Sequence, residues 1–144
     1  MRLLPFQVFG QGADGVRMET RFLYSGKQVR RPTHVVVYFE SYSPEPRFEK
    51  LSAVEWNADD TRIVMGELDR TQSSSQLGVI ERISGELPVA AFLALVSAER
   101  VEARLAPVRF AVTASDLAAL RHFAAKIPPG DEPASPRVST RTNR

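Results

Sequence analysis

Apolar and polar side chains alternate along much of this chain with a period of two residues, the spacing of a β-strand with one face on a core. In residues 16–24 (VRMETRFLY) one side consists of Val16, Met18, Thr20, Phe22 and Tyr24. Residues 51–68 predict two more strands about a turn at residues 57–60, where Asn and Asp favour turn geometry. Residues 101–112 predict a hairpin with its bend at Ala106-Pro107. The pattern therefore predicts a fold rich in antiparallel strands.

Two further stretches predict strands, and one polar stretch predicts a loop. Residues 33–40 (THVVVYFE) are apolar on both sides from Val35 to Phe39, which is typical of a central strand covered on both faces. Residues 76–83 (QLGVIERI) also predict a strand. The preceding residues 69–76 (DRTQSSSQ) are expected to form a solvated loop.

Two segments predict helices. Residues 87–98 (LPVAAFLALVSA) carry no charge, and Pro88 suits the first helical turn, where its missing N–H is not needed. One broad side of that helix consists of Val89, Phe92, Leu93, Leu95 and Val96. Residues 113–127 begin with Thr113 and Asp116 at the spacing of a capping box and continue with an amphipathic pattern. The sequence thus predicts an α+β fold, an antiparallel sheet or half-open sandwich of about seven strands with a short internal helix and a C-terminal amphipathic helix.

Length and composition bound the class of protein. With 144 residues, of which 43% are apolar and 25% charged, the chain is long enough to bury a core as one domain. We expect this domain to span residues 1–127, and residues 128–144, rich in proline, serine and charge, to be a disordered C-terminal tail. The chain has no cysteine, which excludes disulfides and thiol catalysis. No stretch approaches the apolar length of a membrane helix or the pattern of a secretion signal, which predicts a cytoplasmic protein.

The positive charges do not form a phosphate-binding pattern. The formal net charge is only +2, and the C-terminal stretch contains Arg137, Arg141 and Arg144. The other basic residues are scattered, with no run longer than Arg30-Arg31. We therefore expect no nucleic-acid partner.

The stretch GQGADG, Gly10 to Gly15, has the glycine spacing of a dinucleotide-binding turn. Such a site needs a helix after the glycines and an acid at the end of the next strand, a position that Glu40 could take. Residues 16–24 scatter their apolar side chains when drawn as a helix but share a face when drawn as a strand. We therefore expect a connection between antiparallel strands and no cofactor, with dinucleotide binding as an alternative.

Few side chains suggest chemistry. His34 and Glu40 could act as a proton-shuttling pair if the fold brought them together, so a small enzyme is a second alternative. No metal-ligand spacing and no catalytic motif is present, and we predict no metal site. The proline-punctuated loop SYSPEPRFEK carries an arginine and aromatic rings, residue types that interfaces use. The candidate binding surface consists of Tyr42, Arg47, Phe48 and Trp56, with a position at the edge of the core as the alternative for Phe48.

The order of HVVVYFESYSPEPRFEK, VEWNADD and GVIERISGELPVAAFLALVSAERVEARLAPVRFAVTASDLAALRHFA resembles a small β-rich domain found in uncharacterised bacterial proteins. The resemblance spans residues 33–127 and covers a turn after the middle strand, a short helix before the VEARL hairpin and a closing helix. Where that domain often has a glycine, this chain has Ala106. The resemblance implies the fold and supplies no site. The function expected is a non-enzymatic binding or accessory module of bacterial type, with a protein partner or self-association.

Overall fold

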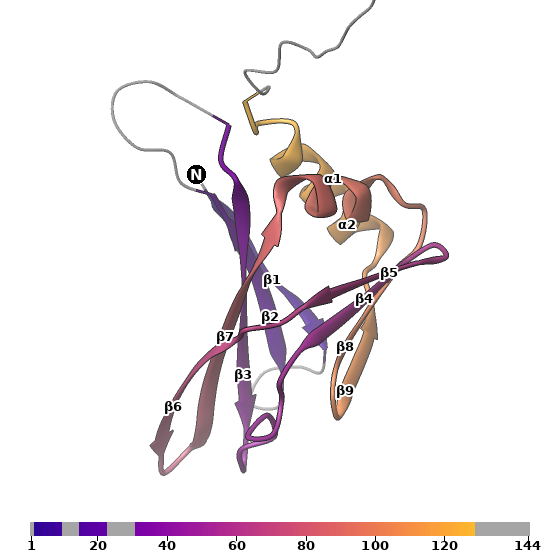
Figure 1. Cartoon of the computed structure of the whole chain (residues 1–144). Helices are drawn as coiled ribbons and strands as arrows, with labels where there is room; N and C mark the ends of the chain where they lie inside the picture. The colour runs from indigo at the N-terminus through magenta and orange to yellow at the C-terminus, as the bar shows by residue number, and fades with distance from the viewer. Residues whose placement is uncertain (1, 10–14, 23–30, 129–144) are drawn as a thin grey trace, which may run out of the picture.

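The computed structural model describes residues 2–9, 15–22 and 31–128. Within these residues the chain forms nine strands and two helices (Figure 1). In chain order they are β1 (Arg2–Phe9), β2 (Val16–Arg21), β3 (His34–Ser43), β4 (Val54–Ala58), β5 (Thr61–Met65), β6 (Asp69–Ser75), β7 (Gly78–Pro88), α1 (Val89–Ser97), β8 (Val101–Leu105), β9 (Val108–Ala111) and α2 (Ala114–Ala124). The expected tail, residues 128–144, lies outside the described part of the chain except for its first residue.

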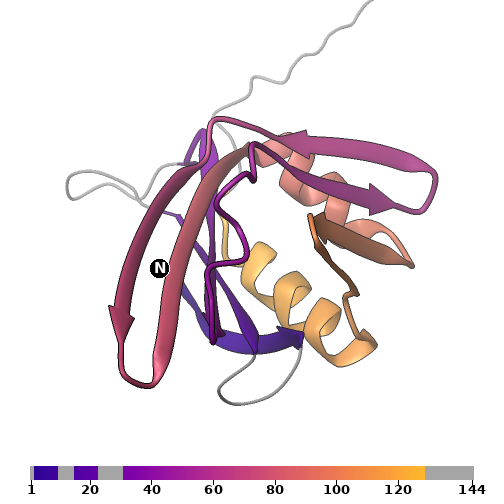
Figure 2. The same ribbon diagram turned by 90° about the horizontal axis from the view of Figure 1, so that it is seen from below.

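The described strands form two antiparallel sheets, of five and four strands, rather than the single sheet or half-open sandwich of about seven strands that the sequence predicted. The first sheet has the order β1-β2-β3-β7-β6, and the second has the order β5-β4-β8-β9. The two helices lie together near one end of the sheets (Figure 1), and α2 is seen between the sheets from below (Figure 2). The α+β class predicted from the sequence is confirmed, and its division into two sheets is the finer result.

The core lies between the inner faces of the two sheets. Phe39 of β3 connects the two sheets across the core, because its ring centroid lies 6.0 Å from that of Trp56 on β4 and 6.4 Å from that of Phe110 on β9. Phe123 of α2 closes one end of the core, with ring centroids 5.3 Å from Phe22 and 5.9 Å from Phe92 of α1. Such edge-on ring contacts stabilise the core in addition to the apolar area that it buries.

The predicted helices form close to where expected, and the Thr113 cap is confirmed, whereas Pro88 ends β7 instead of lying in the first turn of α1. Pro88 precedes α1, and the buried side of α1 consists of Val89, Phe92, Leu95 and Val96. Thr113 caps α2, because its hydroxyl accepts a hydrogen bond from the backbone N–H of Asp116 over 3.1 Å. Arg121 of α2 donates to the carbonyls of Val96 and Ala98, at 2.7 and 2.6 Å, and so satisfies the C-terminal end of α1.

Two expectations about strands were wrong. Residues 69–75, expected to be a loop, form β6, which pairs with β7 from Asp69 opposite Ser84 to Ser75 opposite Gly78. Its polar side chains are almost all exposed, so no apolar alternation marks the strand in the sequence. β3 is central in its sheet, but only its inner face is buried. Its outer side chains are half-buried, because no layer covers the outer face among the described residues.

Gly78 stands at a position that only glycine fits, at the start of β7. Its φ is +131°, and a Cβ added there would lie 2.7 Å from the backbone oxygen of Ser43. We expect Gly78→Ala to lower the free energy of unfolding by about 2 kcal/mol or more, because strain and a backbone clash combine. Gly66→Ala is the matched control, since nothing lies within 4 Å of the added carbon. Urea unfolding of both variants checks this, and equal stabilities would contradict it.

Candidate functional site

A buried carboxylate attaches the loop of residues 44–53 to the inner face of the first sheet. Glu81 of β7 is 0% exposed. Its Oε1 accepts from the backbone N–H of Arg47 at 2.8 Å, and its Oε2 accepts from the N–H of Phe48 at 3.0 Å. The guanidinium of Arg70 on β6 donates to the same Oε2 at 2.8 Å. Three donors from two segments therefore converge on one side chain.

These donors keep Glu81 ionised. Burial alone would raise the pKa of the Glu81 carboxyl, but the backbone N–H of Arg47, the Arg70 guanidinium and the N–H of Phe48 together hold it below its ordinary value. A charge that is buried and fully hydrogen-bonded is a positioning device, because its removal would leave its donors without an acceptor. Glu81 thus fixes where the 44–53 loop lies.

Arg47 is also held in place, by contacts within its own neighbourhood. Its Nε donates to the hydroxyl of Ser41 at 2.9 Å, and a terminal nitrogen donates to the carbonyl of Tyr42 at 2.7 Å. Its guanidinium carbon lies 5.9 Å from the ring centroid of Phe48. The candidate contact residue Arg47 is therefore half-buried and built into the wall of the loop.

Phe48 and Trp56 lie in the core. The sequence placed both on a candidate binding surface, yet each is 0% exposed. Phe48 points inward because the hydrogen bond from its backbone N–H to Glu81 turns the loop toward the sheet. Trp56 occupies an inward position of β4, between the exposed Asn57 and half-buried Glu55. Neither ring is available on an exposed contact surface.

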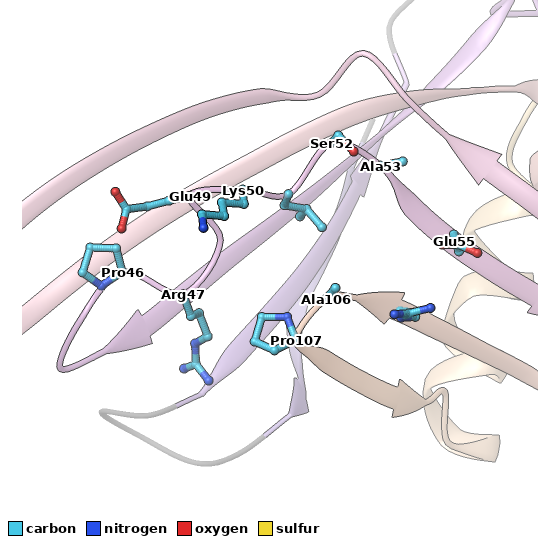
Figure 3. Close-up of a pocket in the computed structure, with 11 residues that line it drawn as sticks. Pro46, Arg47, Glu49, Lys50, Ser52, Ala53, Glu55, Ala106 and Pro107 are labelled. Carbon is cyan, nitrogen blue, oxygen red and sulfur yellow. The ribbon is translucent and has the colours of Figure 1, made fainter.

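A groove of about 520 Å³ lies between the 44–53 loop and the turn that joins β8 to β9. Figure 3 shows Pro46 and Arg47 on the loop side, with Ala106 and Pro107 across from them. Leu51, Ser52 and Ala53 continue the lining toward the second sheet. The groove therefore combines an apolar lining with a rim of charged residues, which are Arg47, Glu49, Lys50, Glu55 and Arg104.

The rim of the groove has two cations without a hydrogen-bond acceptor among the described residues, Lys50 and Arg104. Glu55, the nearest acid to Arg104 by register, is already bound by Arg62, at 2.8 and 3.0 Å. The hydrogen bond and charge of Arg62 lower the pKa of the Glu55 carboxyl, with a smaller contribution from the charge of Arg104. Glu49 is the one rim acid without a hydrogen-bond donor among the described residues, so the two cations outnumber it and the rim is suited to an incoming carboxylate.

Tyr42, the remaining candidate, lies on β3 and faces outward from the first sheet. Its hydroxyl donates to Glu40, whose other oxygen accepts from Nε of Arg82 at 2.6 Å. Burial would raise the pKa of Glu40, but the hydrogen bonds from Tyr42 and Arg82 bring it below its usual range. The hydrogen bond to Glu40 raises the pKa of Tyr42. Tyr42 therefore lies on a different surface from the groove.

The structure does not bring His34 and Glu40 together. They are six residues apart on one extended strand, which separates their Cα atoms by about 20 Å. Nδ1 of His34 lies 2.9 Å from the hydroxyl of Thr33, and Glu40 is bound by Tyr42 and Arg82. The geometry that a proton-shuttling pair needs is absent at these two residues.

The glycine stretch is described only at its last residue, Gly15, since residues 10–14 lie outside the described ranges. The flanking strands are informative, because β1 and β2 are antiparallel neighbours. Residues 16–21 form a strand, with Val16, Met18 and Thr20 buried as the alternation predicts. The helix that a dinucleotide-binding turn requires is therefore not found at residues 16–21.

Comparison with protein-family models, with curated proteins and with solved structures finds no match to this chain. In the described ranges, no group of three or more His, Cys, Asp or Glu side chains is placed to hold a metal ion. None of the described helices is long and apolar enough to cross a membrane.

Sequence reasoning named Arg47 but missed the other residues that build the groove. Glu81 did leave a signal, because the alternation of residues 79–83 places it on the same inward side as Val79 and Ile83. A carboxylate at an inward position of a strand has to find donors. Lys50 and Arg104 left no such signal in the sequence, because only the fold brings the 44–53 loop beside the β8–β9 turn.

Proposed function

We propose that this protein is a non-enzymatic binding module, and that the groove between the 44–53 loop and the β8–β9 turn receives an extended, acidic segment of a partner protein. The observation that carries the proposal is the pair of cations at the rim, Lys50 and Arg104, beside an apolar lining. Apolar lining supplies contact area, and charges at the rim select and orient the ligand.

The choice of a peptide segment over a small molecule rests on shape and composition. The groove is open and about 520 Å³ in volume, with apolar positions spread along it at Leu51, Ala53, Ala106 and Pro107. An extended segment presents alternate side chains to such a lining and leaves the others for the rim. Acidic residues at the alternate positions would meet Lys50 and Arg104.

The state of the carboxylates also favours binding over acid–base catalysis. Glu40 and Glu81 both have a pKa below the ordinary value, and each is fixed by hydrogen bonds from neighbouring residues. A general base needs a pKa near the working pH and reach to a substrate proton. These two acids support structure instead.

A fluorescein-labelled decapeptide of alternating Glu and Val tests the groove. We expect saturable binding by fluorescence anisotropy that weakens as salt is raised, and a Lys-Val peptide should not bind. Lys50→Glu/Arg104→Glu should weaken binding at least about tenfold, because two attractions become repulsions.

The matched control is Arg100→Glu/Lys126→Glu, which changes the net charge equally at two exposed residues outside the groove. This control should bind nearly as well as the unchanged protein. If both double variants lose affinity equally, the attraction is general and the groove is not the site. Absence of binding by the unchanged protein up to about 1 mM peptide would also count against the proposal.

A further inference from the structure

β6 leaves one edge of the first sheet open. It is the last strand in the order β1-β2-β3-β7-β6, and no other described strand pairs with its outer edge. An edge strand presents unpaired N–H and C=O groups that can extend the sheet with another chain. The seven residues of β6 are long enough for such pairing.

After Asp69 and Arg70, the rest of β6 lacks the usual protection of an edge. Proteins block edge pairing with charges, proline or bulges. β1 contains Pro5, β5 contains Arg62, and β9, which contains Arg109, begins directly after Pro107. β6 has five uncharged residues in succession, from Thr71 to Ser75, and all five are exposed.

We propose that β6 pairs in antiparallel fashion with β6 of a second copy of this chain, so that one sheet runs through both. A twofold axis at Gln72, the centre of residues 69–75, pairs all seven residues of each strand. Thr71 then lies opposite Ser73 of the second copy, and Arg70 lies opposite its Ser74. No two like charges face each other, and the Thr–Ser pairs are favourable cross-strand neighbours.

Leu77 supports a second copy as the occupant. It lies at the tip of the β6–β7 hairpin and is 94% exposed, although large apolar side chains favour burial. In the proposed register each strand extends past the other, and Leu77 of one copy reaches residues 67–68 of the other. The half-buried Leu68 offers an apolar neighbour there.

A charge-swap experiment tests the pairing by sedimentation over a range of protein concentrations. We expect the unchanged protein to dimerise. Thr71→Lys/Ser73→Lys and Thr71→Glu/Ser73→Glu should each weaken dimerisation at least tenfold, because residues 71 and 73 face one another across the axis. An equimolar mixture of the two variants should recover dimers. Asn57→Lys/Ala111→Lys, which changes two exposed residues of the second sheet, is the matched control and should dimerise like the unchanged protein.

Hydrogen exchange of the unchanged protein provides an independent measurement. Protection of the β6 amides should rise with protein concentration, whereas β8 and β9 should not change. The proposal would be overturned if the unchanged protein stays monomeric, if the Lys variant dimerises normally, or if the mixture recovers no dimers. It would also be overturned if hydrogen exchange in β6 does not depend on protein concentration. The variants of β6 leave the groove untouched, so this proposal and the one for the groove fail separately.

Discussion

Glu81→Ala is expected to lower the free energy of unfolding by about 3–5 kcal/mol. The substitution leaves the backbone N–H groups of Arg47 and Phe48 and the guanidinium of Arg70 without their acceptor. Glu81 is 0% exposed, so water does not replace the lost carboxylate without opening the loop. Urea unfolding followed by tryptophan fluorescence measures the effect, since Trp56 is the one tryptophan.

Glu86→Ala is the matched control, because Glu86 lies on the same strand but is exposed. It should change stability by no more than about 0.5 kcal/mol. Equal losses for the two variants would show that the carboxylate of Glu81 has no special role in holding the 44–53 loop.

The same carboxylate predicts how stability depends on pH. Because the pKa of Glu81 is lower in the folded protein than in the unfolded chain, its contribution is fully present above the unfolded value of about 4.3. The contribution is lost as the pH falls through the folded pKa. Glu81→Gln should therefore lose less stability than the unchanged protein when the pH is lowered from 6 toward 3, and parallel curves would contradict this assignment.

Phe48→Ala should lower the free energy of unfolding by about 3–5 kcal/mol, because a fully buried ring is replaced by a cavity. This is the opposite of what a contact residue on an exposed surface would do. Glu49→Ala, at the exposed next position of the same loop, should be nearly neutral. Thermal and urea unfolding of the two variants measure the difference.

The effects of Phe48→Ala and Glu81→Ala should not be additive. The backbone N–H of Phe48 bonds Glu81, so each substitution releases the segment that the other holds. The double variant should therefore lose less than the sum of the two single losses. A sum that is fully additive would mean that the ring and the carboxylate act on independent parts of the fold.

Periodicity predicted the elements whose own residues divide into an apolar and a polar side. β2, β4, β8 and both helices do so, and each lies close to where the pattern placed it. β6 does not, because its pairing with β7 and not its own side chains makes it a strand. The second face of β3 was expected to be covered because valine and aromatic side chains also occur there, but half-buried positions on an open sheet accept them.

The candidate site was predicted in part, and the failures have a physical reason. Of the four residues expected on a binding surface, only Arg47 lines the groove. Which side chains of the 44–53 loop point inward is decided by Glu81, more than thirty residues further along the chain. Contacts over that separation have no local signal, and they bury Phe48, one of the rings placed on the candidate surface.

The two sides of the groove belong to different sheets. Glu81 fastens the 44–53 loop to the first sheet, whereas Glu55 and Arg104 stand on strands of the second. The spacing of those sheets is set where Phe39 meets the ring of Trp56. Binding in the groove and packing in the core should therefore be thermodynamically coupled. A ligand that contacts both sides of the groove should raise the free energy of unfolding, and a substitution that weakens core packing should lower the affinity for that ligand.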